Sequence, residues 1–183
     1  QPIQLLWVNL VTDCFPALAL GMEEAEGDVM KRKPRNASDG VFAGNMGLDT
    51  VVQGLIITVL VLASFFCGVY FDLGVIDLSK LATSMADEEG VMMAFITLNM
   101  VEIFHCFNMR SRRASIFHMK KQNKWLWALV LTLIVVEVDA LSMIFFGVEH
   151  LEPKGMITAL ALGFLIIPLV EIYKAIMRAV EKE

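Results

Sequence analysis

The chain has 183 residues, of which 57% are hydrophobic and only 19% are charged, and its formal net charge is −5. Its mean hydropathy of +0.64 is unusual for a soluble domain of this size. The composition therefore argues against a soluble globular enzyme, and its charge pattern gives no reason to expect a nucleic-acid partner. We expect a protein that lies mostly within a lipid bilayer.

Five apolar stretches predict five membrane-spanning helices. Windows of about 19 residues place them near residues 3–21, 48–71, 91–109, 124–148 and 155–177, and each is long enough to cross roughly 30 Å of hydrocarbon. The connections between the stretches are short and leave no room for a separate soluble domain. We therefore expect one all-α domain over residues 1–183, a polytopic bundle of five transmembrane helices.

The first predicted span contains an unusual group of polar residues. Asn9, Thr12 and Asp13 fall within about a third of the circumference of a helix, so their side chains project from one face. Pro16 lies on the same face, and its ring clashes with the carbonyl of Thr12, so we expect the helix to be kinked or opened here. These groups offer hard oxygen ligands, and an ionisable residue within a span indicates an ion or proton site. The alternative is that they only join helices through hydrogen bonds.

The positively charged residues predict the orientation of the bundle. Thirteen of the fifteen lysines and arginines lie in the connections after the first and third spans or at the C-terminal end. The other two, Lys80 and Lys154, lie in the remaining connections, which are otherwise acidic. Because cytoplasmic connections are enriched in lysine and arginine, we expect the N-terminus outside and the C-terminus in the cytoplasm.

Three carboxylates lie in the third and fourth spans. Glu102 belongs to a polar sector of the third span, where binding of an ion and hydrogen-bonded packing both remain open. Glu137 and Asp139 lie near the middle of the fourth span, about 200° apart on a helix, so they cannot both face the same partner. A neutral carboxylic acid bonded to a neighbouring helix is one interpretation of these two acids, because burial raises the pKa of a carboxyl group.

The chain contains no motif of a hydrolytic or nucleotide-binding site. There is no Walker loop, HExxH or GxSxG arrangement, so we expect no catalytic residue in this chain. Cys14, Cys67 and Cys106 give neither a disulfide framework nor a CxxC metal pattern. The chain begins with Gln1 and enters a span directly, which predicts that it is part of a longer protein.

A family resemblance begins in the first predicted span. The run QLLWVNLVTDCFPALALG, residues 4–21, resembles the sixth transmembrane helix of P-type cation-transporting ATPases, and residues 23–35 resemble the cytoplasmic loop that follows it. More loosely, residues 107–117 resemble the end of the eighth helix and residues 168–174 the end of the tenth. The resemblance thus covers the chain as helices six to ten, and it implies the same external start and cytoplasmic end.

This resemblance implies a pump driven by an aspartyl-phosphate intermediate, with ATP and Mg2+ bound in cytoplasmic domains outside this chain. In calcium pumps of the family, the positions matching Asn9, Thr12 and Asp13 bind the transported ion together with residues of helices four and five. The expected function is therefore export of Ca2+ from the cytoplasm. The eighth helix can contribute one carboxylate to a calcium site, which leaves Glu102 and Asn108 as candidates for a further ligand.

Further expectations concern the fourth span, the partners of the chain and its membrane. Some members carry acids on the ninth helix, so Glu137 and Asp139 are candidates for a proton site or a further ion site. The implied partners are the lipid bilayer, helices one to five, and the phosphorylation domain, against which the loop after the sixth helix lies. Short loops and the lack of a eukaryotic sorting signal favour a multi-pass protein of the bacterial cytoplasmic membrane.

Two alternatives to a calcium pump remain open. Pumps for Mn2+ or for Na+ and K+ resemble the same motif, although the sodium/potassium branch has aspartate at the position of Asn9, and branches that include manganese-accepting pumps have methionine at that of Thr12. The second alternative is a stand-alone, non-enzymatic membrane subunit that reuses these helices.

Overall fold

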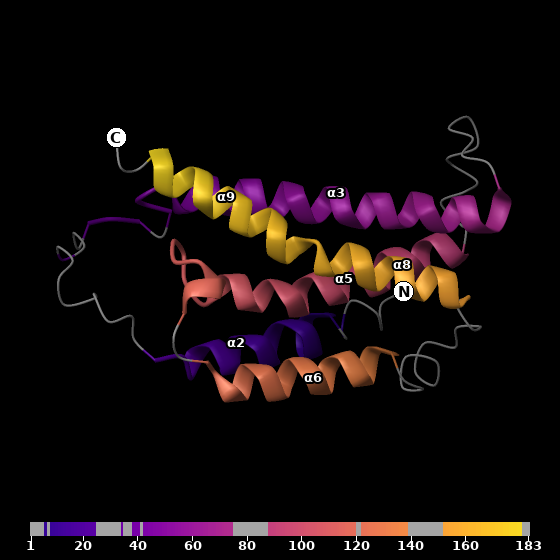
Figure 1. Ribbon diagram of the computed structural model, residues 1–183, viewed down its shortest axis with the longest axis horizontal. Coiled ribbons are helices and arrows are strands. Elements are labelled where there is room, and N and C mark those ends of the chain that lie inside the picture. Colours follow the sequence, from indigo (N-terminus) through magenta and orange to yellow (C-terminus); the bar gives the residue numbers. More distant parts are fainter. Residues whose placement is uncertain are drawn as a thin grey trace.

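The computed structural model describes residues 6, 8–24, 34, 38–40, 42–74, 88–119, 122–138 and 152–180. Every regular element in these ranges is helical, which confirms the predicted all-α bundle (Figure 1). In chain order the elements are the π-helix η1 (Val8–Asp13), α2 (Cys14–Gly21), α3 (Met46–Leu73), α5 (Glu88–Met109), the 3-10 helix η4 (Ile116–His118), α6 (Lys124–Val138), α8 (Pro153–Phe164) and α9 (Ile166–Val180).

Within the described residues, three helical segments are long and apolar enough to cross a membrane. They are Met46–Leu73, Glu89–Met109 and Pro153–Val180, which match the second, third and fifth predicted spans. The first predicted span corresponds to η1 and α2, described from residue 8 onward. α6 corresponds to the first half of the fourth, whose residues 139–148 lie outside the described part of the chain.

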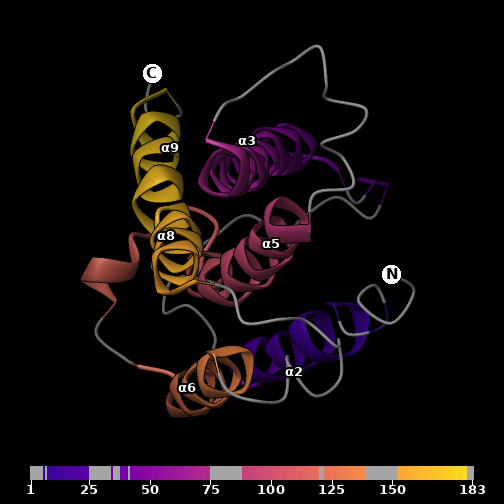
Figure 2. The same ribbon diagram turned by 90° about the vertical axis from the view of Figure 1, so that its right-hand side faces the viewer.

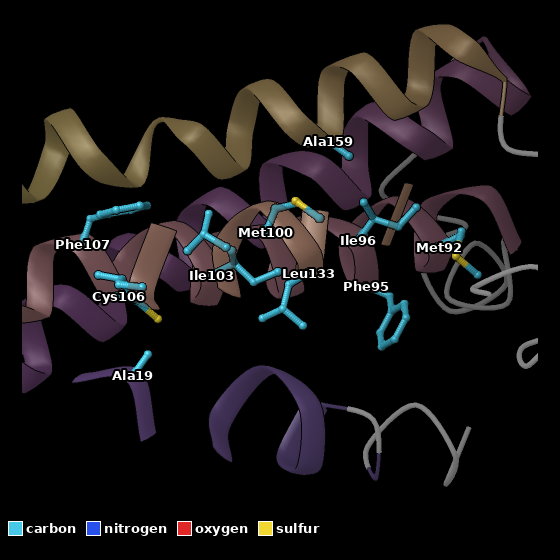
Figure 3. Close-up of a cluster of buried hydrophobic side chains, with 12 residues drawn as sticks. Ala19, Met92, Phe95, Ile96, Met100, Ile103, Cys106, Phe107, Leu133 and Ala159 are labelled. Atoms are coloured by element: carbon cyan, nitrogen blue, oxygen red, sulfur yellow. The ribbon is translucent and has the colours of Figure 1, made fainter. Parts of the chain in front are cut away.

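α5 lies at the centre of the bundle. It packs against α3, α6, α8, α9 and the η1–α2 segment, and Figure 2 shows these helices arranged around it. Its buried side chains form most of a hydrophobic cluster that α2, α6 and α8 complete (Figure 3). The cluster consists of Ala19, Met92, Phe95, Ile96, Met100, Ile103, Cys106, Phe107, Leu126, Val130, Leu133 and Ala159.

Glycines allow α5 to approach two of its neighbours closely. A Cβ atom added to Gly68 of α3 would lie 2.6 Å from the Cα atom of Gly90 in α5. One added to Gly163 of α8 would lie 2.5 Å from the Cβ atom of Met100. Small residues at such contacts are typical of helices that associate in a bilayer, where close van der Waals packing replaces the hydrophobic effect.

α8 and α9 form one membrane-length segment that is interrupted near Leu165. Pro168, the third residue of α9, has no N–H to donate to the carbonyl of Phe164, and its ring crowds the same carbonyl. The interruption therefore falls where the proline weakens the helix, and Figure 1 shows the change of direction between α8 and α9.

The described positive charges gather at one end of the bundle. α5 and α9 end there and α3 and α6 begin there (Figure 1), and the cations at those helix ends are Arg110, Arg112, Arg113, Lys124, Lys174 and Arg178. Lys154 begins α8 at the opposite end, close to Glu152. We call the first of these the basic end; its assignment to the cytoplasm remains a prediction from the sequence.

Candidate functional site

The polar group of the first span lies on a widened helix. Val8–Asp13 form a π-helix, and α2 continues directly from it at Cys14. Pro16, three residues after the π-helix, is buried and cannot donate a hydrogen bond to Thr12. The sequence predicts a kinked or opened helix at this point, and a π-helix is an opened helix of a kind often found at functional sites.

Thr12 joins this segment to the central helix. Its side chain is only 2% exposed, and its hydroxyl donates a hydrogen bond to the carboxylate Oε2 of Glu102 on α5. Asn9 and Asp13 are exposed on the surface of the described bundle. The backbone carbonyl of Asn9 accepts a hydrogen bond from the Cys14 thiol at 3.3 Å, so part of its hydrogen-bonding capacity is already used.

Two carboxylates belong to elements that pack against each other. Asp13 is the last residue of η1, Glu102 lies on α5, and the Thr12 hydroxyl bonds η1 to α5. Cys106, one helical turn after Glu102, donates its thiol hydrogen to the Glu102 backbone carbonyl at 3.1 Å. Within the described ranges, no three His, Cys, Asp or Glu side chains form a preassembled metal cluster. The site offers two carboxyl groups together with amide and hydroxyl oxygens.

The other residues that the sequence suggested as site candidates lie away from η1 or outside the described part of the chain. Asn108 is buried against α9, where its side-chain amide donates to the carbonyl of Ile166 at 3.3 Å. Glu137 is in the last turn of α6, near the end of its described part. Asp139 falls outside the described residues. Of the four additional candidates, the structure brings Glu102 to η1 and places Asn108 toward a different helix.

Comparison with known proteins identifies the family. The family described as "Cation transporting ATPase, C-terminus" matches residues 1–176.

The chain belongs to this family.

Relatives of this cation-ATPase chain include a Bacillus cereus protein named Calcium-transporting ATPase 1, which is 37% identical over 179 residues. That match covers 93% of the chain and 20% of the relative. The Bacillus subtilis Calcium-transporting ATPase is 39% identical over 135 residues, covering 74% of the chain and 14% of the relative. The Sodium/potassium exporting P-type ATPase 1 of Saccharomyces cerevisiae is 41% identical over 70 residues, covering 38% and 6% respectively. The chain thus spans about a fifth or less of these relatives.

A polar clamp at the basic end of this cation-ATPase region escaped the sequence analysis. Glu23, just after α2, accepts hydrogen bonds from Arg110 Nη2 at 2.7 Å and from Asn123 Nδ2 at 2.8 Å. Asn123 Nδ2 also donates to the carbonyl of Ala19 at 2.9 Å. Burial raises the pKa of the Glu23 carboxyl, but the hydrogen bonds from Arg110 and Asn123 outweigh it, so the pKa lies below its ordinary value.

A second cluster around Asp49 joins α3, α9 and the segment that follows α5. This side chain in the first turn of α3 is buried and accepts hydrogen bonds from Tyr173 Oη at 2.7 Å and Arg113 Nη1 at 3.1 Å. Arg112 Nε donates to the same carboxylate. For both clusters, the sequence showed an acidic residue at one end of a span and arginines directly after a different span. This pattern alone does not specify which acidic and basic side chains form ion pairs.

Proposed function

We propose that this chain is the membrane region of an ATP-driven pump that exports Ca2+ from the cytoplasm. Two of the relatives described above are named as calcium-transporting, and the family model matches nearly the whole chain. The observation that carries the proposal is the contact between Thr12 on a π-helix and Glu102 on the central helix. It joins the ion-ligand motif of the first span to a second carboxylate.

The donor set of this site suits a hard divalent cation. Asn9, Thr12 and Asp13 can offer up to about four side-chain oxygens, whereas Ca2+ takes six to eight. Glu102 would add up to two more and bring the side-chain charge to −2 with Asp13, which balances one Ca2+. The remaining ligands would come from backbone carbonyls released by the π-helix and from helices four and five of the pump.

The bond between Thr12 and Glu102 is compatible with ion binding. The Thr12 hydroxyl donates its hydrogen to Glu102, and a hydroxyl in this role still has oxygen lone pairs that can ligate a cation. The hydrogen bond supplies a partner for the buried Thr12 hydroxyl and for Glu102 while no ion is bound. We infer that this bond positions Thr12 and Glu102 for ion ligation during transport.

The energy source lies outside the chain. ATP and Mg2+ would bind in cytoplasmic domains, and the partners of this membrane domain would be helices one to five, the phosphorylation domain and the surrounding lipid. A multi-pass protein of the bacterial cytoplasmic membrane agrees with the Bacillus relatives. A pump for Mn2+ or for Na+ and K+ is the alternative cargo assignment, and the match to a yeast sodium/potassium exporter is the observation that favours the second.

The test is cation-dependent ATP hydrolysis by the full-length protein that carries this chain. Wild type is compared with Asp13→Asn and Glu102→Gln, and with Asp72→Asn, an exposed acid of α3, as the control. We expect micromolar Ca2+ to stimulate the wild type and the control, and the two site variants to need at least about tenfold more Ca2+, equivalent to about 1.4 kcal/mol of binding energy.

Other outcomes lead to different conclusions. Stimulation by Mn2+ or by Na+ and K+ alone keeps the pump and changes its cargo. Calcium stimulation that is unaffected in both site variants would mean that the Thr12–Glu102 contact only joins helices. A coding sequence that starts immediately before Gln1, without an upstream Asp-Lys-Thr-Gly phosphorylation motif, would favour the stand-alone membrane subunit.

A further inference from the structure

Two polar contacts join the first span to the central helix. In one, the Thr12 hydroxyl of η1 donates to Glu102 of α5. In the other, Arg110, which directly follows α5, forms an ion pair with Glu23, which lies just after α2. The two contacts occur in the same order along both elements, because Thr12 precedes Glu23 and Glu102 precedes Arg110. They therefore link the same pair of elements at two levels of the bundle.

The ion pair between Arg110 and Glu23 is extensively hydrogen-bonded. Arg110 Nε donates to both carboxylate oxygens at 3.1 Å, and Nη2 donates to Oε1 at 2.7 Å. Arg110 Nη1 donates to Gln122 Oε1 at 3.2 Å, and Asn123 Nδ2 donates to Glu23 Oε2 at 2.8 Å. The Arg110 side chain is 2% exposed and that of Glu23 is 17% exposed. Both charged groups are thus held in one geometry and are largely removed from solvent.

A buried ion pair of this kind specifies register better than it adds stability. Removing two charges from water costs about as much free energy as their attraction returns, and the best-attested role of buried polar pairs is to fix how helices align. The apolar contacts of α2 are small by comparison. Its buried residues are Pro16 and Ala19, and Ala19 packs in the hydrophobic cluster beside α5 (Figure 3). Since the hydrophobic effect does not drive helices together in a bilayer, such contacts leave the register open.

The register between the first span and α5 decides whether the residues of the ion site meet. A slip of one helical turn displaces a helix by about 5.4 Å, which exceeds the length of a hydrogen bond, about 3 Å. Thr12 would then lose its contact with Glu102. Arg110 lies about two turns beyond Glu102 on the same helix, so an alignment fixed by the ion pair is also fixed at the ion site.

We propose that Arg110 and Glu23 are positioning residues for the ion site, and that their ion pair sets the register in which Thr12 meets Glu102. This inference rests on the proposed function, because it concerns the affinity of the same site for Ca2+. Arg110 is roughly 12 Å from Glu102 along the helix axis at 1.5 Å per residue, so it acts without touching the ion.

The test is ATP hydrolysis by the full-length protein as a function of Ca2+ concentration. The wild type is compared with Arg110→Gln, with Glu23→Gln and with the double variant. We expect the Ca2+ concentration for half-maximal activity to rise about fivefold in each single variant, with the maximal rate unchanged. Because both residues act through one ion pair, the double variant should be no weaker than either single variant. An unchanged half-maximal concentration in the folded single variants would overturn the proposal.

The sign of the changes separates positioning from electrostatics. By charge alone, loss of Arg110 would strengthen the binding of a cation, whereas loss of Glu23 would weaken it. Loss of register weakens binding in both variants. Shifts of opposite sign in Arg110→Gln and Glu23→Gln would therefore contradict the positioning role.

Arg113→Gln is the matched control. It removes a cation from the same segment, but Arg113 Nη1 is bonded to Asp49 on α3 and not to the first span. We expect this variant to lower the Tm and to leave the half-maximal Ca2+ concentration unchanged. An equal rise of that concentration in Arg113→Gln would mean that general loss of stability weakens Ca2+ binding, and the proposal would be wrong.

Arg110→Lys covers the case in which Arg110→Gln does not fold. Lysine keeps the charge but lacks the planar fork that bonds both carboxylate oxygens, so the half-maximal Ca2+ concentration should rise by a smaller factor. No rise in either Arg110→Lys or Glu23→Gln refutes the proposal. A wild type that no cation stimulates refutes the proposed function together with this inference, whereas a Ca2+-stimulated wild type with unaltered variants refutes this inference alone. If another cation stimulates the wild type, the same comparison applies to that cation.

Discussion

Gly68 offers a sensitive test of how closely the second and third predicted spans pack. The methyl group of Gly68→Ala would lie 2.6 Å from the Cα atom of Gly90, whereas carbon atoms in contact lie about 3.5–4.0 Å apart. The three nearest atoms are all backbone atoms of Glu89 and Gly90, which cannot rotate away as a side chain can. α3 and α5 must therefore separate by roughly 1 Å, and overpacking of this kind costs about 1–3 kcal/mol.

Gly54→Ala on the same helix isolates that cost. Both variants replace a helical glycine by alanine, which stabilises a helix by up to about 1 kcal/mol, so this gain cancels in the comparison. Since nothing lies within 4 Å of a Cβ atom at Gly54, only Gly68→Ala should carry the clash. The predicted difference in the free energy of unfolding is about 1–3 kcal/mol, or roughly 2–12 °C in Tm for a domain of this size.

The measurement is the Tm of each variant in detergent. It is determined by heating samples and quantifying the remaining folded protein by fluorescence-detected size-exclusion chromatography. We expect Gly54→Ala to match or exceed the wild type and Gly68→Ala to fall below both. Equal Tm values for the two variants would refute the close approach of α3 and α5. A Gly68→Ala variant that melts above the wild type would be equally incompatible with it.

Two further predictions concern the polar clusters at the basic end. The pKa of Glu23 is lowered in the folded protein, so the stability that this carboxylate contributes is fully present above the ordinary glutamate pKa and is lost as the pH falls through the folded pKa. Between pH 7 and pH 3, the Tm of Glu23→Gln should therefore fall less steeply than that of the wild type or of the exposed control Glu24→Gln. Parallel curves of Tm against pH would contradict the clamp. Asp49→Asn should lower the free energy of unfolding by about 2 kcal/mol, because it weakens charged hydrogen bonds from two arginines. Asp39→Asn, at an exposed position, should leave the free energy of unfolding unchanged, and equal Tm values for the two variants would contradict the Asp49 cluster.

The helices could be predicted from the sequence because the mean hydropathy of a segment depends only on the residues within that segment. Membrane-length apolar stretches form helices, since every backbone group in a bilayer must find a partner within its own segment. The opening of the first span was likewise local, because Pro16 acts on a carbonyl four residues earlier. These features required no knowledge of how the spans are arranged.

The partners of polar side chains could not be predicted in the same way. The sequence made both Glu102 and Asn108 candidates for a further ligand beside the first span. In the structure, the orientation of α5 turns Glu102 toward η1 and Asn108 toward α9. Glu23 and Arg110 are separated by 87 residues in the chain, and their contact depends on how three helices meet at the basic end. Such contacts follow from packing, which a single sequence does not specify.

The clamp around Glu23 determines where the first span can bend. Its C-terminal end is fastened twice, by Glu23 to Arg110 and by the Ala19 carbonyl to Asn123, so α2 is tied to the start of α6 and the end of α5. The π-helix that carries Asn9 and Asp13 ends eight residues before Gly21, and it packs against α5, where the Thr12 hydroxyl donates to Glu102. If the proposed transport moves the first span, we therefore expect η1 to take up the movement, while the end of α2 that is tied to Arg110 and Asn123 stays in place.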